Sequence, residues 1–410
     1  MKLVFIYRYF YPDYSASCQF LSDLAFFLSG EGYSVHVVTS RLLYVCPEET
    51  LLPSEDVRNI TVHRVWTSRF GRHFLPGRAI DYLTFYLAAS WKIFRLLGQG
   101  DVAITKTDPP MISVLAAWIA RIRGAKLVNW LQDLFPEVAV ALEVKGIKGR
   151  IGRSLLRMRN KSLQSAAVNV VIGERMKDRL IAEGIPEQRI SVIHNWADGD
   201  VIRRSPSFHR TYRREWGLEA KFVVGYSGNL GRAHEFDTIL DAATLLRSEK
   251  NIAFLFIGGG AQRERVEEEG LSRGLDNLVF QAYQPREMLS ESLGVTDVHL
   301  VSLRPELEGL IVPSKFYGIL AAGKPTLFIG DPQGEIASII NEGGVGQSIQ
   351  SGDSEALAQQ ILELNGSAEK IESMGLAARD LFNSRFTSQH AIQQWNDLIE
   401  SVIHEDFMRK

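Results

Sequence analysis

The chain has 410 residues, of which 45% are hydrophobic, 10% aromatic and 23% charged, a composition that excludes intrinsic disorder and fibrous repeats. Its length suits two or three domains, each able to bury a core of its own. The net charge of −2 is the sum of two unequal halves: residues 1–200 carry 25 Lys and Arg against 19 Asp and Glu, and residues 201–410 carry 21 against 29.

The first half alternates short β-rich apolar runs with helix-like stretches. Residues 2–10 and 33–40 predict strands, and between them apolar residues recur at the three-to-four spacing of a helix, at Phe20, Leu21, Leu24, Phe27 and Leu28. A strand, a helix and a strand in this order form a βαβ unit, which implies a parallel sheet. A strand at 101–106, a helix at about 110–123 and strands at 126–133 and 167–173 continue the alternation. We therefore predict a doubly wound α/β domain.

The second half repeats this architecture after a break. Residues 194–216 lack periodicity and are rich in turn-favouring residues, which predicts a linker. A strand from Lys221, a helix at about 235–247 and strands within 252–260, 277–283, 297–303 and 325–330 then predict a second α/β domain. We expect ligands to bind in a cleft at the carboxyl ends of the two sheets.

Cysteine content and the amino terminus bear on the compartment. Two cysteines, Cys18 and Cys46, are too few for a disulfide framework, and no Cys or His has the spacing of a zinc site. The first apolar run, Leu3 to Tyr7, is too short for a signal-peptide core. We therefore expect a cytoplasmic protein that holds no metal.

The sequence GYSGNLGR, residues 225–232, leaves a predicted strand and enters a predicted helix. Its glycines, Gly225, Gly228 and Gly231, would let bare N–H groups and the positive end of a helix face an anion. Arg232 adds a guanidinium whose forked donors suit phosphate oxygens. The alternative is an ordinary strand-to-helix turn with a surface arginine.

A second anion-favouring loop lies at residues 304–315. Glu308 and Gly309 lie on it, and Lys315 falls in the first turn of a predicted helix, where the dipole disfavours a cation. A bound phosphate would reverse that penalty, and the amides of Gly309 and Leu310 would complete a pocket for it. The alternative is a buried amphipathic helix with a solvated lysine.

A glycine-rich loop at residues 258–260 is similar to part of a dinucleotide fingerprint. Gly258 and Gly260 follow a predicted strand, but Arg263 stands where the third glycine belongs. The loop also lies late in the chain, whereas dinucleotide-binding domains carry this motif in their first βαβ unit. A nicotinamide site is therefore not favoured.

Polar residues also follow strands of the first domain. Asp133 and Glu137 come at the end of the strand at 126–133. A carboxylate there can accept a hydrogen bond from a sugar hydroxyl or can position the acceptor substrate of the reaction. The alternative is that Asp133 caps the following helix. The loop from Tyr11 to Ser17 follows the first strand in the same way and is small enough to line a cleft.

With these residues placed, the chain resembles the retaining glycosyltransferases of family 4, which have the GT-B fold of two Rossmann-like domains. Within the family it is similar to bacterial transferases of the colanic-acid, exopolysaccharide and O-antigen type. The resemblance covers nearly the whole chain, through YFYPDYSASCQFLSDLAFFLSGEGYSVHVVTS, LQDLFPE, VIHNWAD, GYSGNLGR, FIGGGAQRERVE and EGLIVPSKFYGILAAGKP in the family's order. It implies an acceptor-binding domain at 1–196, a nucleotide-sugar-binding domain at 197–384, and a C-terminal helix at about 385–410 that packs back onto the first domain.

The resemblance also implies an activity. A sugar would pass from a nucleotide-diphosphate sugar to a lipid-linked or saccharide acceptor in cell-surface polysaccharide biosynthesis, with retention and without cofactor or metal. Positive side chains and backbone dipoles would stabilise the departing diphosphate. We assign the catalytic residues as Glu308 and Asp133. We assign the donor diphosphate to Gly228, Asn229, Arg232, Gly309, Leu310 and Lys315, the donor nucleoside to Gly258, Tyr283 and Glu335, and the acceptor to Tyr11, Ser15, Ser17 and Glu137.

The sequence departs from the family's pattern in the second domain. The family's second glutamate falls at Gly318, so the acid that binds the ribose must come from elsewhere, and Glu335 is the candidate. Asn229 and His234 stand where relatives carry an arginine and a lysine. Arg232 and Lys315 would then bear the charge of the diphosphate.

In the first domain, Gln132 and Asp133 stand where relatives often carry a His-Asp pair, so no histidine catalyst is expected. Two other functions remain open: a nucleotide-sugar epimerase of the same fold, and a nucleotide-sugar-binding protein without catalysis. Incubation with nucleotide sugars and a lipid-linked acceptor distinguishes the three functions. A transferase moves the sugar to the acceptor, an epimerase interconverts the free donor, and a binding protein only binds it.

Basic residues concentrate in two segments of the first domain. Residues 64–95 hold six Lys and Arg, one acid and eight aromatic residues, and residues 145–161 hold seven Lys and Arg and no acid. The stretch 79–91 is too short to span a bilayer, which takes about 20 apolar residues. We expect this domain to bind the anionic inner face of the cytoplasmic membrane rather than nucleic acid, with a contribution from Lys145, Lys148, Arg150 and Arg153. The alternative is that the aromatic residues are core and the charges a solvated face.

Overall fold

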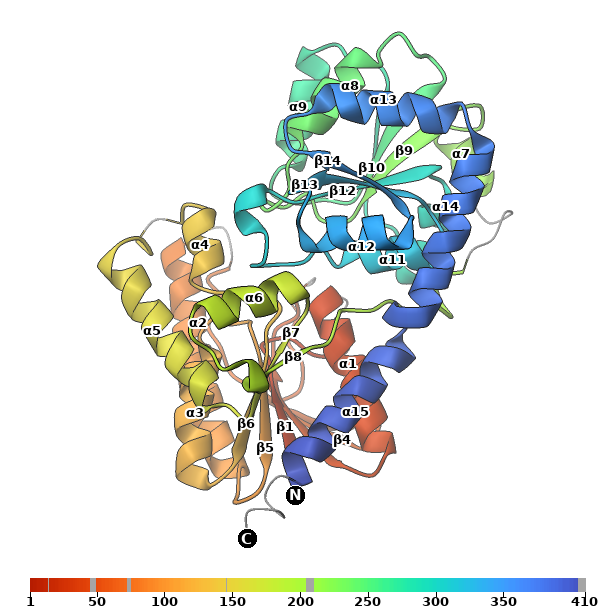
Figure 1. The fold of residues 1–410 in the computed structure, drawn as a ribbon. Coiled ribbons are helices and arrows are strands. Elements are labelled where there is room, and N and C mark those ends of the chain that lie inside the picture. The colour runs from red at the N-terminus through yellow and green to blue at the C-terminus, as the bar shows by residue number, and fades with distance from the viewer. Residues whose placement is uncertain (14, 45–48, 72–74, 145, 204–209, 405–410) are drawn as a thin grey trace. The chain divides into compact units, whose positions relative to one another are not determined.

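The computed structural model describes residues 1–13, 15–44, 49–71, 75–144, 146–203 and 210–404, and it divides the chain into two compact units. Unit 1 comprises Met1–His194 and Ala391–Lys410, and unit 2 comprises Asn195–His390. Each unit has one sheet with helices on both faces (Figure 1). The α/β class predicted from the sequence is therefore confirmed.

The sheet of unit 1 has eight strands in the order β3-β4-β2-β1-β5-β6-β7-β8. All neighbouring strands are parallel except β3, which pairs antiparallel with β4. The strands β3, β4 and β8 were not predicted from the sequence. Apolar side chains from both faces of β1 are buried because helices cover both sides. The strands are β1 Lys2–Ile6, β2 Ser34–Ser40, β3 Ser54–Val57, β4 Ile60–Val65, β5 Val102–Lys106, β6 Lys126–Trp130, β7 Val168–Val171 and β8 Ile190–Val192.

Two helices of unit 1 bear on function. In α2 (Leu75–Leu96) one face, with Phe85 and Ile93, is buried in the core, whereas the opposite face is exposed. In α15 (Ser388–His404) the ring of Trp395 packs 4.6 Å from that of Trp130, centroid to centroid. The other helices are α1 Ala16–Gly30, α3 Ile112–Arg123, α4 Glu137–Ala141, α5 Arg150–Ser165, α6 Glu174–Ala182 and the 3₁₀ turn η1 Glu187–Arg189.

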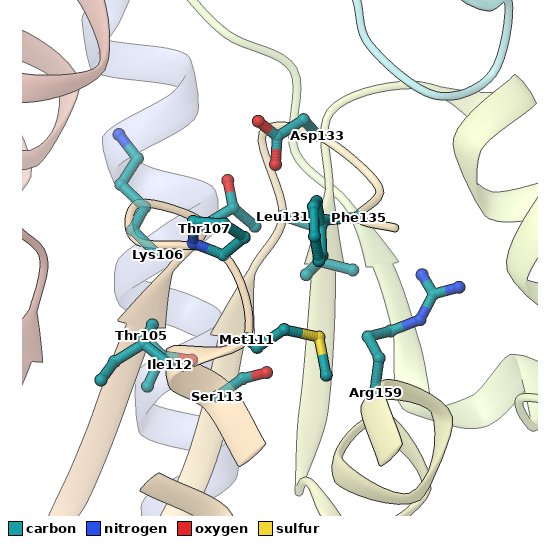
Figure 2. A pocket seen from close by; sticks show the side chains of 11 residues that line it. Thr105, Lys106, Thr107, Met111, Ile112, Ser113, Leu131, Asp133, Phe135 and Arg159 are labelled. Carbon is teal, nitrogen blue, oxygen red and sulfur yellow. The ribbon is translucent and has the colours of Figure 1, made fainter. Parts of the chain in front are cut away.

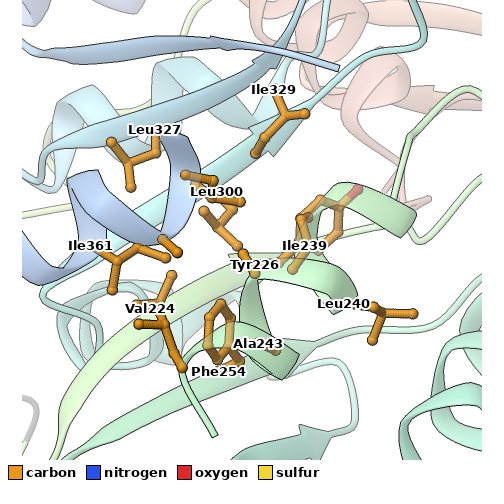
Figure 3. Packing of buried hydrophobic residues seen from close by; sticks show 14 of the residues in the cluster. Val224, Tyr226, Ile239, Leu240, Ala243, Phe254, Leu300, Leu327, Ile329 and Ile361 are labelled. Carbon is orange, nitrogen blue, oxygen red and sulfur yellow. The ribbon is translucent and has the colours of Figure 1, made fainter. Parts of the chain in front are cut away.

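The sheet of unit 2 has six parallel strands in the order β11-β10-β9-β12-β13-β14. Every residue of β10, IAFLFI, is buried, as expected for a central parallel strand. Figure 3 shows the core that Val224, Phe254 and Leu300 form with the helices. The strands are β9 Phe222–Ser227, β10 Ile252–Ile257, β11 Leu278–Gln281, β12 Val298–Ser302, β13 Thr326–Gly330 and β14 Gly346–Gln350.

The helices of unit 2 alternate with these strands, and a short one lies within the predicted linker. They are α7 Arg210–Glu215, α8 Asp237–Leu245, α9 Arg263–Ser272, α10 Leu289–Gly294, α11 Lys315–Ala321, α12 Glu335–Gly343, α13 Ser354–Asn365 and α14 Ala368–Leu381, with 3₁₀ turns η2 Arg286–Met288 and η3 Pro305–Leu307 and the π-helical turn η4 Phe382–Phe386. No helix in the described ranges is long and apolar enough to cross a membrane.

Candidate functional site

Four loops of unit 2 gather at one edge of its sheet. They follow β9, β10, β12 and β13, and because these strands are parallel, their carboxyl ends meet at the same edge. The loops hold the residues that the sequence assigned to the donor, apart from Tyr283 after β11 and Lys315 at the start of α11. The edge is the place where open parallel sheets bind ligands.

The glycines after β9 and β10 bring two backbones into close contact. The N–H of Gly228 donates to the carbonyl of Ile257 at 2.8 Å. Gly258 has φ of 135°, and a Cβ at this position would overlap the carbonyl of Gly228. A side chain at either position is therefore disfavoured, and the two loops expose bare backbone to a ligand.

Lys315 points at this glycine pair from α11. Its Nζ lies 3.6 Å from the centroid of the Tyr226 ring, and also 3.6 Å from where a Cβ on Gly228 would stand. The Nζ atom is buried and has no hydrogen-bond partner among the described residues. Burial alone holds the pKa of Lys315 well below its usual value, because no nearby carboxylate compensates the charge.

His234 lies beside this lysine as a neutral imidazole. Burial first, and then the charge of Lys315, lowers the pKa of His234 to about 3. Its Nδ1 lies 2.5 Å from the carbonyl of Ser302, which fixes the ring at the end of β12. His234 is therefore a neutral group in this loop, and Lys315 is the buried basic side chain beside it.

Arg232 follows in the same loop, and its side chain is exposed and makes no hydrogen bond to any described residue. Two amides that were assigned to the diphosphate are differently placed. The N–H of Leu310 donates to the carbonyl of Leu307 at 3.0 Å, and that of Gly309 to Oε1 of Glu308 at 3.3 Å. Both amides are used within the turn after η3 in this structure, and the assignment of Gly309 and Leu310 to the diphosphate stays a prediction.

Glu308 and Glu335 meet at the start of α12. Oε1 of Glu308 accepts a hydrogen bond from the backbone N–H of Glu335 at 2.8 Å, so Glu308 satisfies one free amide of that helix. Burial raises the pKa of Glu308. Glu335 is buried, while Gly318, where relatives carry a glutamate, faces the side chains of Ile202 and Leu293.

The remaining donor residues line the edge around the glycines. Asn229 follows Gly228, and its side-chain oxygen lies against Gly260. Tyr283 is 60% exposed, and its hydroxyl donates to the carbonyl of Gly259 at 3.4 Å. Its ring lies against Gly258, where a flat side chain can stack on a ligand base. Thus Gly228, Asn229, Lys315, Gly258 and Tyr283 form one cluster.

Asp133 occupies a separate position in unit 1, after β6. Burial raises the pKa of Asp133 to about 6, although a hydrogen bond with the side chain of Thr107 opposes the shift. It does not cap α4, whose N-cap is Pro136 without a side-chain bond. Figure 2 shows Asp133 and Thr107 at one end of a cavity of about 20 Å³, with Arg159 on its far side.

Glu137 is held in an ion-pair network. It begins α4, and its carboxylate forms an ion pair with the buried guanidinium of Arg159, which also binds Glu183 at 2.7 Å. This network joins α4, α5 and the end of α6, while Oε2 of Glu137 has no partner among the described residues. Assignment of Glu137 to the acceptor stays a prediction.

The other acceptor residues lie around the start of α1. Tyr11 is 40% exposed, and its ring meets that of Phe26 edge-on at 5.7 Å. The Oγ of Ser15 is buried without a partner among the described residues. The carbonyl of Ser17 accepts a hydrogen bond from the buried Nζ of Lys106. Of the three, Tyr11 is the most accessible.

Comparison with known proteins assigns the family. Residues 19–196 match the glycosyl transferase 4-like domain, and residues 208–381 match the glycosyl transferases group 1. The glycosyltransferase WbjE of Pseudomonas aeruginosa is 30% identical over 343 residues, which cover 82% of this chain and 84% of WbjE. The chain belongs to the family 4 glycosyltransferases. This glycosyltransferase is also 24% identical to the colanic acid biosynthesis glycosyl transferase WcaI of Escherichia coli K12, over 75% of this chain and 74% of WcaI.

Solved structures agree on the fold. The glycosyltransferase superposes on Anabaena HepE, a structure in complex with UDP and glucose, with a TM-score of 0.74 at 16% identity, over 98% of this chain and 100% of HepE. The prediction of a GT-B fold is therefore confirmed. Sequence reasoning missed Tyr226, whose ring supports Lys315, because an aromatic residue inside a strand has the pattern of core.

Proposed function

We propose that this glycosyltransferase takes its sugar from a nucleotide-diphosphate donor bound at the carboxyl edge of unit 2, and transfers it with retention to a saccharide acceptor of cell-surface polysaccharide. The observation that supports this is the ammonium of Lys315, which is buried without a counter-ion beside the Gly228 loop. A buried, uncompensated charge is costly, and a phosphate oxygen would compensate it.

The charge of the donor would be shared between two cations. Lys315 reaches the glycine loops from inside unit 2, and Arg232 can reach the same loops from solvent because its side chain is not held by other residues. Charge develops on the leaving diphosphate as the glycosidic bond breaks, and preorganised cations stabilise that charge without a metal ion. The neutral His234 adds no competing charge, and its one N–H is already used at Nδ1 toward the Ser302 carbonyl.

Two carboxylates complete the proposal. Glu308 would accept hydrogen bonds from hydroxyls of the donor sugar rather than contact the diphosphate, which would repel it. Glu335 would take the place of the ribose-binding acid absent at Gly318. Asp133, with its raised pKa, is the proposed acceptor-side carboxylate, because a group that titrates near pH 6 can exchange a proton with a hydroxyl.

Thermal-shift measurements with nucleoside diphosphates test the donor site first, because a ligand that binds only the folded state raises the melting temperature. Incubation of the protein with nucleotide sugars and a lipid-linked saccharide then tests the reaction. Transfer with retained anomeric configuration is expected. Interconversion of the free donor would instead identify an epimerase, and binding without either reaction would identify a non-catalytic protein.

We also propose that unit 1 binds the anionic inner face of the cytoplasmic membrane. The outer face of α2 carries a stripe of apolar side chains that are 44–66% exposed, at Ile80, Leu83, Leu87 and Trp91. The packed neighbour α3 adds Trp118 and Ile122, 64% and 51% exposed. A contiguous stripe of exposed apolar side chains is unusual on the surface of a monomeric protein, and it suits the interfacial region of a lipid bilayer.

Charge supports the same partner. The sequences of α3 and α5 contain no acid, and the single acid of α2, Asp81, is turned inward, where it accepts hydrogen bonds from Ser68, Phe70 and Gly71. Exposed basic residues lie on these three helices. They include Arg95, Arg121, Arg123, Arg150, Arg153 and Arg157, all exposed, while Lys145 lies outside the described residues.

Co-sedimentation with lipid vesicles tests this surface. Binding to anionic vesicles is expected to fall with added salt and to weaken when Lys148, Arg150 and Arg153 are changed to Gln. Leu87→Gln with Trp91→Gln should weaken binding at any salt concentration, whereas Leu271→Gln, an exposed leucine of unit 2, should not. Equal binding to neutral and anionic vesicles would contradict the electrostatic part, and dimerisation through α2 would assign the stripe to a second copy.

A further inference from the structure

Among the described residues of unit 1, three arginines are buried, and one of them has no counter-ion in that part of the chain. Arg64 forms an ion pair with Glu55, and Arg159 with two glutamates. The side chain of Arg8, which is 6% exposed, makes no hydrogen bond or ion pair with any described residue, and its Nε is fully buried. Because a guanidinium stays charged at all ordinary pH, this burial is costly unless an anion binds there.

Arg8 lies at the ligand edge of the sheet, directly after β1 ends at Ile6. Its guanidinium carbon is 5.3 Å from the ring centroid of Tyr9 and 5.1 Å from that of Tyr82. These cation–π contacts offset part of the desolvation. They leave the N–H donors of the guanidinium without acceptors.

A second guanidinium approaches the same ring. Arg78, near the start of α2, lies 5.3 Å from the Tyr82 centroid and donates to the Tyr82 hydroxyl from Nε at 2.9 Å and from Nη2 at 2.7 Å. The hydroxyl is therefore an acceptor in these bonds, and its own proton remains available to a ligand. Arg8, Arg78 and Tyr82 thus present converging donors.

One carboxylate acts on this cluster. The charge of Asp108 raises the pKa of Arg78 and of Tyr82. The backbone N–H of Arg8 donates to the Asp108 carbonyl at 2.9 Å, which holds the loops after β1 and β5 together.

We propose that Arg8, Arg78 and Tyr82 bind the phosphate of the acceptor, so that the acceptor of this glycosyltransferase is a saccharide joined to a lipid through phosphate or pyrophosphate. This rests on the proposed function, which supplies the need for an acceptor. The lipid part follows from α2: its start holds Arg78, and its outer face continues as the apolar stripe from Ile80 to Trp91. A chain attached to a phosphate at Arg78 can leave along that stripe into the membrane.

Binding of geranyl pyrophosphate to the intact protein tests the site. Calorimetry is done with the donor site filled by the nucleoside diphosphate that gives the largest thermal shift. Arg8→Met and Arg78→Gln are each expected to weaken binding at least tenfold. The matched control is Arg58→Gln, which removes another exposed arginine of unit 1 that is stacked on an aromatic ring, that of Phe26. It should bind as the wild type does.

Melting temperatures of the variants, and a comparison of geranyl pyrophosphate with inorganic pyrophosphate, show whether a loss of binding reflects the proposed site. Arg8→Met should not lower the melting temperature, because it removes an uncompensated buried charge. If Arg8→Met fails to fold, Arg78→Gln decides, since Arg78 is exposed. Wild-type affinity in Arg78→Gln would overturn the proposal. Inorganic pyrophosphate should bind more weakly than geranyl pyrophosphate, and equal affinities would overturn the lipid part.

A variant of the donor site keeps this test independent of the proposed function. Lys315→Met should retain binding of geranyl pyrophosphate and lose the nucleoside diphosphate. If nucleotide binding is absent from the wild type while the Arg8 and Arg78 variants still lose geranyl pyrophosphate, the proposed donor fails and the anion site stands. If the nucleotide binds and geranyl pyrophosphate does not, the anion site fails alone.

Discussion

The ammonium of Lys315 lies over the ring of Tyr226, 3.6 Å from its centroid, and has no other partner in the described chain. The lysine is also the first residue of α11, where the helix dipole adds a further unfavourable term for a cation. In the free protein, burial therefore disfavours the charged form of Lys315. A bound diphosphate would favour the charged form, which would make the residue a sensitive probe of the proposed donor site.

Lys315→Met should lower affinity for the nucleoside diphosphate by about tenfold to a hundredfold, because a hydrogen bond to a charged group contributes about 1.5 to 3 kcal/mol. Its melting temperature should stay the same or rise, because the substitution removes a buried unpaired charge. Calorimetry and thermal unfolding measure both. The control is Lys324→Met, which removes bonds to the carbonyls of Gly294 and Thr296 and should lower stability without changing affinity. Wild-type affinity in Lys315→Met would remove it from the site.

Gly258→Ala should abolish nucleotide binding. The added Cβ would overlap the Gly228 carbonyl and would sit at a φ of 135°, so the loop after β10 must move away from the loop after β9. The control is Gly344→Ala, which has a positive φ of 61° but open space around its Cβ. Both variants should lose stability in urea unfolding. Only Gly258→Ala should lose the nucleotide, and retained binding there would show that the two loops do not form the donor site.

The sequence was sufficient to predict the glycine loops of unit 2 and its strands from β9 to β13, whereas β14, with the mixed sequence GQSIQ, was not predicted. Central parallel strands such as β10 are apolar throughout, and Gly228 follows such a strand directly, so the loop at the ligand edge could be placed. The sequence could not show that Lys315 is buried or that Glu137 is paired with Arg159. Both depend on contacts between residues distant in the chain. From the sequence alone, a charged residue is expected to be exposed to solvent.

Helix α2 shows a second limit of sequence patterns. Its inward residues, Phe85 and Ile93, and its outward residues, Leu87 and Trp91, are all apolar, so the helix has no polar face to mark its orientation. Aromatic residues of this segment could therefore be predicted either as core or as a membrane surface, and the structure shows that some are buried and others exposed. The burial of Arg8 could not be predicted either, because an arginine that follows an apolar run is expected to mark its exposed end.

Glu308→Gln should retain nucleotide affinity and lose sugar transfer. Glutamine keeps an oxygen that can accept from the N–H of Glu335, so the start of α12 should remain intact. It loses the negative charge that would hold the hydroxyls of the donor sugar. Turnover and nucleotide affinity are measured on the same preparation. Loss of nucleotide affinity would show that Glu308 orders the diphosphate loop through α12 instead of contacting the sugar.

The last prediction concerns the dependence of stability on pH, for which His299 in β12 is the best probe. Burial lowers the pKa of His299 to about 3. Its Nε2 lies 3.0 Å from the carbonyl of Leu293, to which it can donate, whereas Nδ1 is buried without a partner among the described residues. A proton on Nδ1 would therefore be unsatisfied, and the folded protein keeps this imidazole neutral.

In the unfolded chain His299 regains its ordinary pKa of 6.5. Between about pH 6.5 and pH 3 the unfolded chain binds a proton that the folded protein does not, so the free energy of unfolding falls as the pH falls. From pH 7 to pH 5 this amounts to about 2 kcal/mol. His299→Gln removes the titration and retains a donor for the Leu293 carbonyl. Urea unfolding at the two pH values should show a smaller acid-induced loss in the variant by about that amount. His234 and Asp133 titrate in both proteins, so they cancel in the comparison, and an equal loss in wild type and variant would mean that His299 can be protonated in the folded state.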